Sequence, residues 1–190
     1  MARYTGPKIK QCRREGMNLF FLGQNTSSGK VAVLQRRDYP PGVHAQSRRK
    51  VTEYGVRLRE KQKLKRVFGV LERQFKRYFA EAERMKGNTG ENLLALLSRR
   101  MDNVVLAGGF ATTLAQARQM VNHGHFRVNG KKVDIPSFQV TQYDIIDVRE
   151  KSLQMTPLIV ARETHGERVV PGWMDSFPER MRILIHQLPT

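Results

Sequence analysis

Apolar residues recur at intervals of three and four along the chain between residues 64 and 85. This spacing places them on one face of an α-helix and predicts a buried stripe. Gly69 interrupts the repeat and Gly87 follows its last position, so we expect two helices with a break between them. Aromatic residues at helical spacing usually belong to a core, and we interpret the stripe as core rather than as a base-stacking platform. Its members are Leu64, Val67, Phe68, Leu71, Phe75, Tyr78, Phe79, Ala82 and Met85.

A further helix is predicted after residue 88. Thr89 is a suitable N-cap, and Glu91 is favourable in the first turn, where it faces the positive end of the helix dipole. We expect a break near Arg100 and an end at Gly108-Gly109. The apolar positions that continue the helical period are Leu93, Leu97, Met101 and Val104.

The segment from residue 113 to residue 124 predicts a short capped helix. Thr113 and Gln116 form an S/T-x-x-Q capping box, and Gly124 suits the position just beyond a helix C-terminus. Its apolar stripe consists of Leu114, Ala117, Met120 and Val121. The polar side chains off the stripe, which we expect to reach outward, are Arg118, Gln119, Asn122 and His123.

Short strands are predicted in the second half of the chain. Asn129-Gly130 joins two short β-like runs, which is the strongest local signal for a hairpin. Residues 139–148 predict a pair of strands with Asp144 in the turn. The apolar runs at 158–161 and 183–185 fit either a helix turn or a short strand.

Residues 1–50 look least like an independent fold. Turn residues such as Gly6-Pro7 and Pro40-Pro41-Gly42 punctuate the segment, and basic pairs lie between them. Two interpretations remain open. The segment is either a solvated, partly disordered arm in the absence of a partner, or an arm that orders against phosphates, which would neutralise the mutual repulsion of its basic residues.

The composition narrows the choice of partner. Lys and Arg number 34 against 17 Asp and Glu, a net charge of +17, and residues 1–100 carry +16 of it. Such an excess predicts a nucleic acid or an anionic membrane. No apolar run approaches the roughly 20 residues that span a bilayer, and the N-terminus lacks the apolar core of a signal peptide. We therefore expect nucleic acid and no membrane, with the electrostatic grip mainly in the first half of the chain.

The segment 113–132 offers a surface for an anion rather than a catalytic pocket. Arg118 is the first candidate, because a guanidinium can hold a phosphate through two hydrogen bonds; the alternative is an ion pair with Asp102 inside the protein. His123 and His125 flank Gly124, so a turn can aim both at a phosphate or a ribose. A metal site there would lack a third ligand nearby in the sequence.

The hairpin carries further candidates. Asn129 is expected to serve the turn conformation first and a ligand second, and Lys131 and Lys132 are plausible phosphate ligands on an exposed hairpin. A helix terminus with a few cations is better suited to contact the backbone of a nucleic acid, and to recognise its shape, than to contact the edges of its bases. We therefore expect recognition of phosphates and 2′-hydroxyls.

Several motifs in order resemble a known family. Two motifs resemble the S-four RNA-binding domain. They are Leu97-x-x-Arg100-Met101-Asp102-Asn103-Val104 and Ala115-x-Ala117-Arg118-Gln119-x-Val121-x-His123-Gly124-His125-x-x-Val128-Asn129-Gly130. Five further motifs resemble the small-subunit ribosomal protein family that contains this domain. They are Ala2-Arg3-Tyr4-Thr5-Gly6-Pro7, Cys12-Arg13-Arg14-Glu15-Gly16, Tyr39-Pro40-Pro41-Gly42, Leu58-Arg59-Glu60-Lys61-Gln62-Lys63 and Leu71-Glu72-Arg73-Gln74-Phe75. The resemblance covers about the first 150 residues and is loose over 151–190.

The resemblance implies an α+β fold with a mainly helical N-terminal domain, a basic irregular arm and an inserted S-four domain, which is a helix pair with a small antiparallel sheet. The implied divisions are an arm at 1–50, a helical part at 51–95, the S-four domain at 96–150, and a C-terminal segment at 151–190 that packs back on the helical domain.

The resemblance also implies a function. The chain would be a structural component of the small subunit of the cytoplasmic ribosome, a primary rRNA binder that nucleates assembly of the 5′ domain. It would lie beside the path by which mRNA enters, near the third and fifth small-subunit proteins, and contribute to decoding fidelity.

Cys12 bears on metal binding, because many bacterial members of the family carry four N-terminal cysteines spaced as a zinc site. Here Ile9 stands at the first of these positions, Cys12 at the second, and residues 26–31 hold neither of the others. A single thiolate cannot form a tetrahedral zinc site, so we expect a zinc-free form without cofactors. One cysteine also excludes an intrachain disulfide and fits a reducing compartment.

Two alternatives come from other proteins that carry an S-four domain: an RNA-modifying enzyme of the pseudouridine synthase type and an RNA chaperone. Arg100-Met101-Asp102 echoes an Arg-Leu-Asp catalytic triplet, but no separate catalytic domain of adequate length follows it. We therefore expect no enzymatic activity. The residues expected to bind RNA are Arg3, Lys8, Arg13, Arg14, Arg36, Arg37, Arg48, Arg49, Lys50, Arg59, Lys61, Lys63, Arg73, Arg99, Arg100, Thr113, Gln116, Arg118, Gln119, Asn122, His123, His125, Arg127, Asn129, Lys131 and Lys132.

Overall fold

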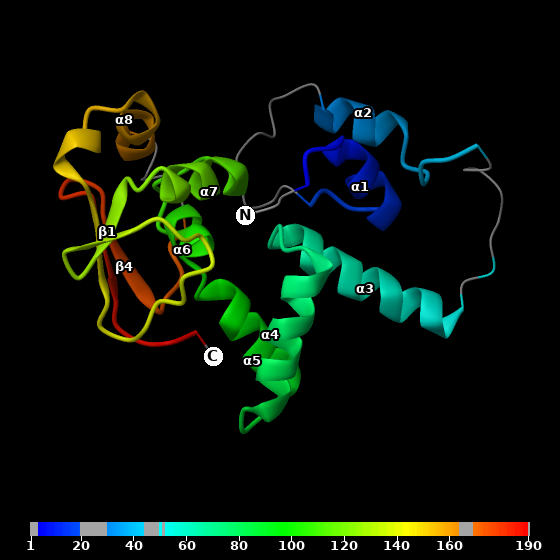
Figure 1. Cartoon of the computed structure of the whole chain (residues 1–190). Coiled ribbons are helices and arrows are strands. Elements are labelled where there is room, and N and C mark those ends of the chain that lie inside the picture. Colours follow the sequence, from blue (N-terminus) through cyan, green and yellow to red (C-terminus); the bar gives the residue numbers. More distant parts are fainter. Residues whose placement is uncertain (1–3, 20–29, 44–49, 51, 164–168, 190) are drawn as a thin grey trace. The chain divides into compact units, whose positions relative to one another are not determined.

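Helices dominate the first half of the chain and a small antiparallel sheet the second, as the computed structural model shows (Figure 1). The structure describes residues 4–19, 30–43, 50, 52–163 and 169–189. It divides into two units, Met1–Lys76 and Arg77–Thr190, which are described separately. The α+β fold predicted from the sequence is confirmed.

The helical prediction for residues 52–86 is confirmed in its outline. Helix α3 (Glu53–Val67) and helix α4 (Glu72–Arg84) are separated at Gly69, whose φ of 59° is the left-handed conformation that glycine adopts without strain. The buried stripe is only partly confirmed. Its buried members are Phe75, Tyr78 and Ala82, whereas Leu71, Phe79 and Met85 are 40–46% exposed and α3 has no buried residue.

The N-terminal arm is more ordered than its sequence suggests. Its described part contains helix α1 (Lys8–Glu15) and helix α2 (Lys30–Arg36). Gly16 ends α1 at φ 66°, and Cys12 and Glu15 are buried. Glu15 lies on the side of α1 that meets α3 and accepts hydrogen bonds from Arg59 and Arg66.

The helix predicted after residue 88 forms as two helices, α5 (Thr89–Ser98) and α6 (Met101–Ala107), so the break near Arg100 is confirmed. The predicted N-cap is wrong by one residue. Asn88 accepts the capping hydrogen bond from the backbone N–H of Gly90, because its short amide reaches the first turn from the extended residue before the helix.

Helix α7 (Leu114–Asn122) begins where the capping box predicts. Thr113 Oγ1 accepts from the backbone N–H of Gln116 at 3.2 Å, but the Gln116 side chain reaches back to Thr112 rather than to Thr113. Gly124 follows the helix with φ 69°, as expected.

The hairpin and a longer sheet follow α7. Strands β1 (Phe126–Val128) and β2 (Lys131–Val133) are joined at Asn129-Gly130, whose φ angles of 49° and 79° are those of a type I′ turn. Strand β3 (Ile145–Val148) pairs with β1. The predicted strand pair over 139–148 is wrong, because the first half forms only an isolated bridge between Gln139 and Arg100.

The segment 151–190 extends this sheet. A 3-10 turn η2 (Glu150–Ser152) and helix α8 (Thr156–Glu163) precede strands β4 (Met174–Phe177) and β5 (Arg182–Ile185). Strand β5 pairs with β3, which gives the antiparallel order β2-β1-β3-β5-β4. The packing of this segment on residues 51–95 stays a prediction.

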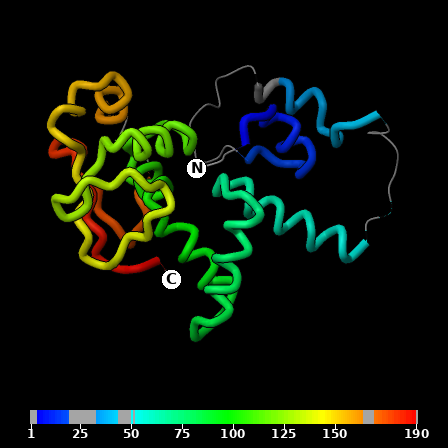
Figure 2. The backbone as a smooth tube through the Cα atoms, in the orientation of Figure 1, coloured from blue at the N-terminus to red at the C-terminus, as the bar shows by residue number. Residues whose placement is uncertain are grey.

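The core of the second unit lies between the sheet and the helices. Figure 1 shows α6 and α7 beside the sheet, and the tube in Figure 2 follows the same path. Inward residues of the strands alternate with outward ones, so each strand contributes every second side chain to the core. Fully buried contributors are Met101, Val104, Val105, Ala117, Val121, Phe126, Ile146, Leu158, Ile183 and Ile185.

Glu15 generates a prediction about the stability of the first unit. Its side chain is fully buried between two arginines, so Glu15→Gln should lower the free energy of unfolding by about 2 kcal/mol. The matched control is Glu53→Gln, because the Glu53–Arg57 pair is nearly 80% exposed and should contribute less than about 1 kcal/mol. Urea unfolding followed by circular dichroism measures both, and equal losses would contradict the assignment.

Candidate nucleic-acid interface

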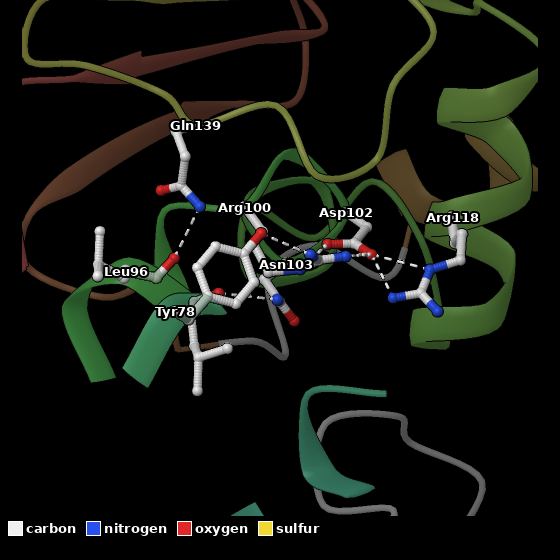
Figure 3. Close-up of polar contacts among 8 residues, drawn as sticks. Tyr78, Leu96, Arg100, Asp102, Asn103, Arg118 and Gln139 are labelled. Atoms are coloured by element: carbon white, nitrogen blue, oxygen red, sulfur yellow. Dashed lines mark hydrogen bonds and ion pairs between the residues drawn. The ribbon is translucent and has the colours of Figure 1, made fainter. Parts of the chain in front are cut away.

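Asp102 is the centre of a buried charge network in the second unit (Figure 3). Arg100 donates to both carboxylate oxygens, with Nε 3.0 Å from Oδ1 and Nη2 2.8 Å from Oδ2. Arg118 donates to Oδ2 from Nε at 2.9 Å and from Nη2 at 2.7 Å. The remaining nitrogen of Arg100, Nη1, donates to the Tyr78 hydroxyl at 2.8 Å. The network joins α4, α6, α7 and the junction before α6.

Two predicted RNA ligands therefore point inward. Arg100 is fully buried and Arg118 is 6% exposed, so the expectation that Arg118 reaches outward is wrong and its alternative, the ion pair with Asp102, is confirmed. The sequence contained a signal for this: Arg118 lies four residues after Leu114 and three before Val121, which puts it on the edge of the apolar stripe.

Arg100 keeps its positive charge despite burial. Burial lowers the pKa of Arg100, but the charge of Asp102 and its hydrogen bonds outweigh this effect, and the pKa rises above its ordinary value. A buried carboxylate shared by two guanidiniums leaves each group with a charged partner, which is the condition under which buried ions are tolerated.

The loop at 136–140 closes over the network. The backbone N–H groups of Met101 and Asp102 donate to the carbonyl oxygens of Phe138 and Pro136. Arg99, also a predicted RNA ligand, donates from Nε to the Val140 carbonyl at 2.9 Å and is half-buried. Hydrogen bonds to this loop and to the Asp102 network thus hold the α5–α6 junction in place. Its three charged residues, Arg99, Arg100 and Asp102, therefore stabilise the fold.

The end of α7 and the hairpin carry the exposed polar surface. Gln119, Asn122, His123, Arg127 and Lys131 are exposed. Among them, Gln119, Asn122, Arg127 and Lys131 have no hydrogen bond or ion pair from their side chains to a described residue. This group, which we call the α7–hairpin surface, matches the predicted binding surface in place but without Arg118.

The two histidines differ in their surroundings. Their rings lie 5.9 Å apart, and His125 Nδ1 is 2.9 Å from the Ser152 hydroxyl. Burial, followed by the charges of His123 and Arg149, lowers the pKa of His125 below its ordinary value. His125 is half-buried, whereas His123 is exposed.

Gly124 allows Lys132 to lie across the end of α7. A Cβ at Gly124 would come within 2.3 Å of Lys132 Cε, near the flexible end of a side chain that can shift. The requirement for glycine comes from the φ of 69°. Lys132 also pairs with Asp134 at 3.3 Å, an exposed contact of small energetic value. The end of the Lys132 side chain thus lies beside Gly124, the residue between the two histidines.

Three other candidates hold local structure. Thr113 and Gln116 cap α7. Asn129 donates to Asp144 Oδ1 at 2.8 Å and accepts from the backbone N–H of Ile145 at 2.9 Å, so its amide ties the hairpin turn to β3. The expectation that Asn129 serves the turn first is confirmed.

Five predicted ligands in the first unit have internal partners; they are Arg13, Arg14, Arg59, Lys61 and Lys63. Arg13 donates to the carbonyl oxygens of residues 37 and 39 and stacks on the Tyr39 ring at 4.7 Å, and Arg14 donates to Pro41. On α3, each of the six basic residues pairs with a glutamate; the pairs are Arg57–Glu53, Arg59–Glu15, Lys61–Glu72, Lys63–Glu60, Lys65–Glu72 and Arg66–Glu15.

These pairs do not cancel the charge of α3. Four glutamates serve six cations, and hydrogen bonds from Lys61 and Lys65 lower the pKa of Glu72 to about 2. The predicted ligands Arg36, Arg37, Lys50 and Arg73 are exposed, without a side-chain partner among the described residues, and Lys8 is exposed. Arg3, Arg48 and Arg49 lie outside the described residues.

Several charged residues outside the predicted set are brought into place by the structure. Glu15 and Arg66 form the α1–α3 contact, and Arg149 donates to the Gly124 carbonyl at 3.1 Å beside His125. Arg182 pairs with Asp147 on the outer side of the sheet. The alternation of Arg182, Ile183, Leu184 and Ile185 was the available signal for this last residue.

The described residues contain no group of three His, Cys, Asp or Glu side chains placed to hold a metal ion. Cys12 is buried, and burial raises the pKa of its thiol. Across the described part of the chain, no helix has the length and apolar character needed to cross a bilayer. The zinc-free arm stays a prediction from the cysteine count.

Comparison with known proteins accounts for the arrangement. Residues 3–98 match the family described as "Ribosomal protein S4/S9 N-terminal domain", and residues 99–146 match "S4 domain". The small ribosomal subunit protein uS4 of Nocardioides is 60% identical over 189 residues, which cover 100% of this chain and 90% of the relative. The chain belongs to the uS4 family. The proteins of the same name from Acidothermus cellulolyticus and Cutibacterium acnes are 54% and 55% identical over 190 residues, or 91% and 90% of their lengths.

Membership of the uS4 family confirms two interpretations. The resemblance of the N-terminal and S-four motifs was correct, and it extends along the whole chain, including residues 151–190. The uS4 family consists of structural proteins rather than enzymes. Asp102, which echoes a catalytic aspartate, is fully buried between two arginines and cannot reach a substrate.

The charge network generates a prediction about stability. Asp102→Asn leaves Arg100 and Arg118 buried without a carboxylate, so the free energy of unfolding should fall by about 3–5 kcal/mol. Tyr78→Phe removes one hydrogen bond to Arg100 and should cost about 1 kcal/mol. Urea unfolding at low and high salt measures both, and because the network is buried the loss should persist at high salt. A loss that vanishes in salt would place Asp102 at the surface.

Proposed function

We propose that this protein is a structural component of the small subunit of the cytoplasmic ribosome and acts as a primary rRNA-binding protein. The observation that carries the proposal is the match of the whole chain, at 52–60% identity, to small ribosomal subunit proteins. A net charge of +17 supports RNA as the partner, because each phosphate contact by Lys or Arg releases a counterion and adds affinity.

The α7–hairpin surface is the part of the second unit that suits an RNA backbone. Amide, imidazole, guanidinium and ammonium groups are presented there by a helix end and a tight hairpin, whose positions the core fixes. Such groups read phosphates and 2′-hydroxyls rather than base sequence. The basic first unit, where cations outnumber carboxylates even within the ion pairs of α3, supplies the longer-range attraction.

The finer function extends this proposal. The protein nucleates assembly of the rRNA 5′ domain, lies beside the path by which mRNA enters, near the third and fifth small-subunit proteins, and contributes to decoding fidelity. What supports these points is the resemblance of the motifs together with the family. The chaperone and pseudouridine synthase alternatives are less well supported, since the match extends over the whole chain and Asp102 is inaccessible.

Sedimentation tests the ribosomal role. The tagged protein, expressed in a cell that lacks its own copy, should migrate with small subunits in a sucrose gradient and remain there at high salt. An unrelated protein of similar size and charge is the control, because electrostatic binding alone is lost as salt rises. Release of both proteins at the same salt concentration would argue for a loose RNA binder instead.

A pair of substitutions tests the assignment of the α7–hairpin surface. Lys131→Gln should weaken binding to a transcript of the small-subunit rRNA and lower the slope of log K against log salt by about 0.9, because one phosphate contact is lost. Arg118→Gln is the matched control: it should lower stability while leaving the slope unchanged, since its side chain is 7% exposed and held by Asp102. Filter binding over a salt series measures both. A reduced slope for Arg118→Gln alone would return Arg118 to the list of phosphate ligands.

A further inference from the structure

The outer side of the five-stranded sheet carries a row of charged residues in register. Lys132 of β2 lies opposite Arg127 of β1, and Arg127 lies opposite Asp147 of β3. Asp147 lies opposite Arg182 of β5, which in turn lies opposite Phe177 of β4. Because paired residues point to the same side of a sheet, these five side chains form one line across all five strands. We call it the outer row.

The outer row faces away from the core. The neighbours of its members along the strands are the inward residues Phe126, Val128, Ile146, Val148 and Ile183, which are buried. Arg127, Lys132 and Arg182 are exposed, and Phe177 is 43% exposed. With strands about 4.8 Å apart, the row extends over roughly 19 Å.

Its charge is positive and organised by one carboxylate. Asp147 accepts from Arg182 Nε at 2.6 Å and from Nη2 at 3.2 Å, so two hydrogen bonds hold the guanidinium beside Asp147. Arg182 Nη1 and one hydrogen of Nη2 remain available to a further acceptor, since a guanidinium carries five donors. Asp147 makes no ion pair with Arg127 among the contacts of the described residues, so Arg127 and Arg182 share the row with a single acid that is already engaged. Lys132 pairs at 3.3 Å with Asp134, which lies outside the row.

We propose that the outer row extends the RNA-binding surface from Arg127, which it shares with the α7–hairpin surface, to β4 and β5, where Arg182 holds a phosphate and Phe177 stacks on an unpaired base. The proposal rests on the proposed rRNA-binding function and adds β4 and β5, from residues 169–189, to the part of the chain that contacts RNA. An exposed aromatic ring beside cations on an open sheet is the arrangement that stacks bases in single-stranded RNA. Charge complementarity favours RNA over an apolar protein partner, because the row has one ring and four charged groups.

The test uses the full-length protein and a transcript of the small-subunit rRNA in a filter-binding salt series. Arg182→Gln should lower the salt slope by about 0.9, whereas Arg182→Lys should keep it. Phe177→Ala should weaken binding about tenfold without changing the slope, and Phe177→Tyr, which retains a ring, should bind as the wild type does. The matched control is Arg162→Gln: Arg162 is exposed at the end of α8, away from the paired strands, and its loss should change neither quantity.

The outcomes separate the inference from the proposed function. If Arg182→Gln and Phe177→Ala bind like the wild type while Lys131→Gln is weakened, the outer row is not an RNA surface and the α7–hairpin surface stands; an acidic protein would then be the partner to seek. If the wild type fails to bind the transcript, the proposed function itself fails. Thermal melting curves measure the stability of each variant. If Arg182→Gln is destabilised, the difference in RNA affinity between Phe177→Ala and Phe177→Tyr decides whether the outer row binds RNA.

Discussion

The second unit depends on one carboxylate shared by two arginines. Asp102 accepts four hydrogen bonds from Arg100 and Arg118, and Arg100 passes the contact on to Tyr78. The ions gain from this arrangement only while all are present, because removing one leaves an uncompensated charge in a buried site. The network therefore ties α6 to α7 through the two hydrogen bonds from Arg118 to Asp102.

The same principle separates the structural cations of this protein from those available to a ligand. On α3 every basic side chain has a glutamate partner, and in the arm Arg13 and Arg14 donate to carbonyl oxygens. Such pairs are worth little each when exposed, but together they prevent the repulsion that a net charge of +17 would otherwise create. The exposed basic residues without a side-chain partner among the described residues include Arg36, Arg37 and Lys50 of the arm, Arg73 of α4, and Arg127 and Lys131 of the hairpin. Placement, rather than the number of charges, marks the interface.

The C-terminal strands show how a short segment can complete a surface. Strand β5 pairs with β3 and brings Arg182 beside Asp147, and β4 adds Phe177 at the edge. Buried residues alternate with outward ones along these strands, so the packing that secures the sheet also determines which side chains remain exposed. The sheet is thus a platform whose inner side is core and whose outer side carries charge.

Local features of this chain were predictable from its residues alone. The break at Gly69, the helix start at Thr113, the hairpin at Asn129-Gly130 and the α+β fold follow from period, caps and turn residues, which act over a few positions. The orientation of the cations was not: Arg118 and Lys131 look alike in sequence, yet Arg118 has its partner 16 residues away in α6, and Lys131 has none among the described residues. Likewise, the sequence around residues 139–140 predicts a strand, but in the structure this segment forms only one isolated bridge, between Gln139 and Arg100. Partners distant in sequence decide both matters, because a charge or a strand edge is exposed or satisfied only by what the fold brings to it.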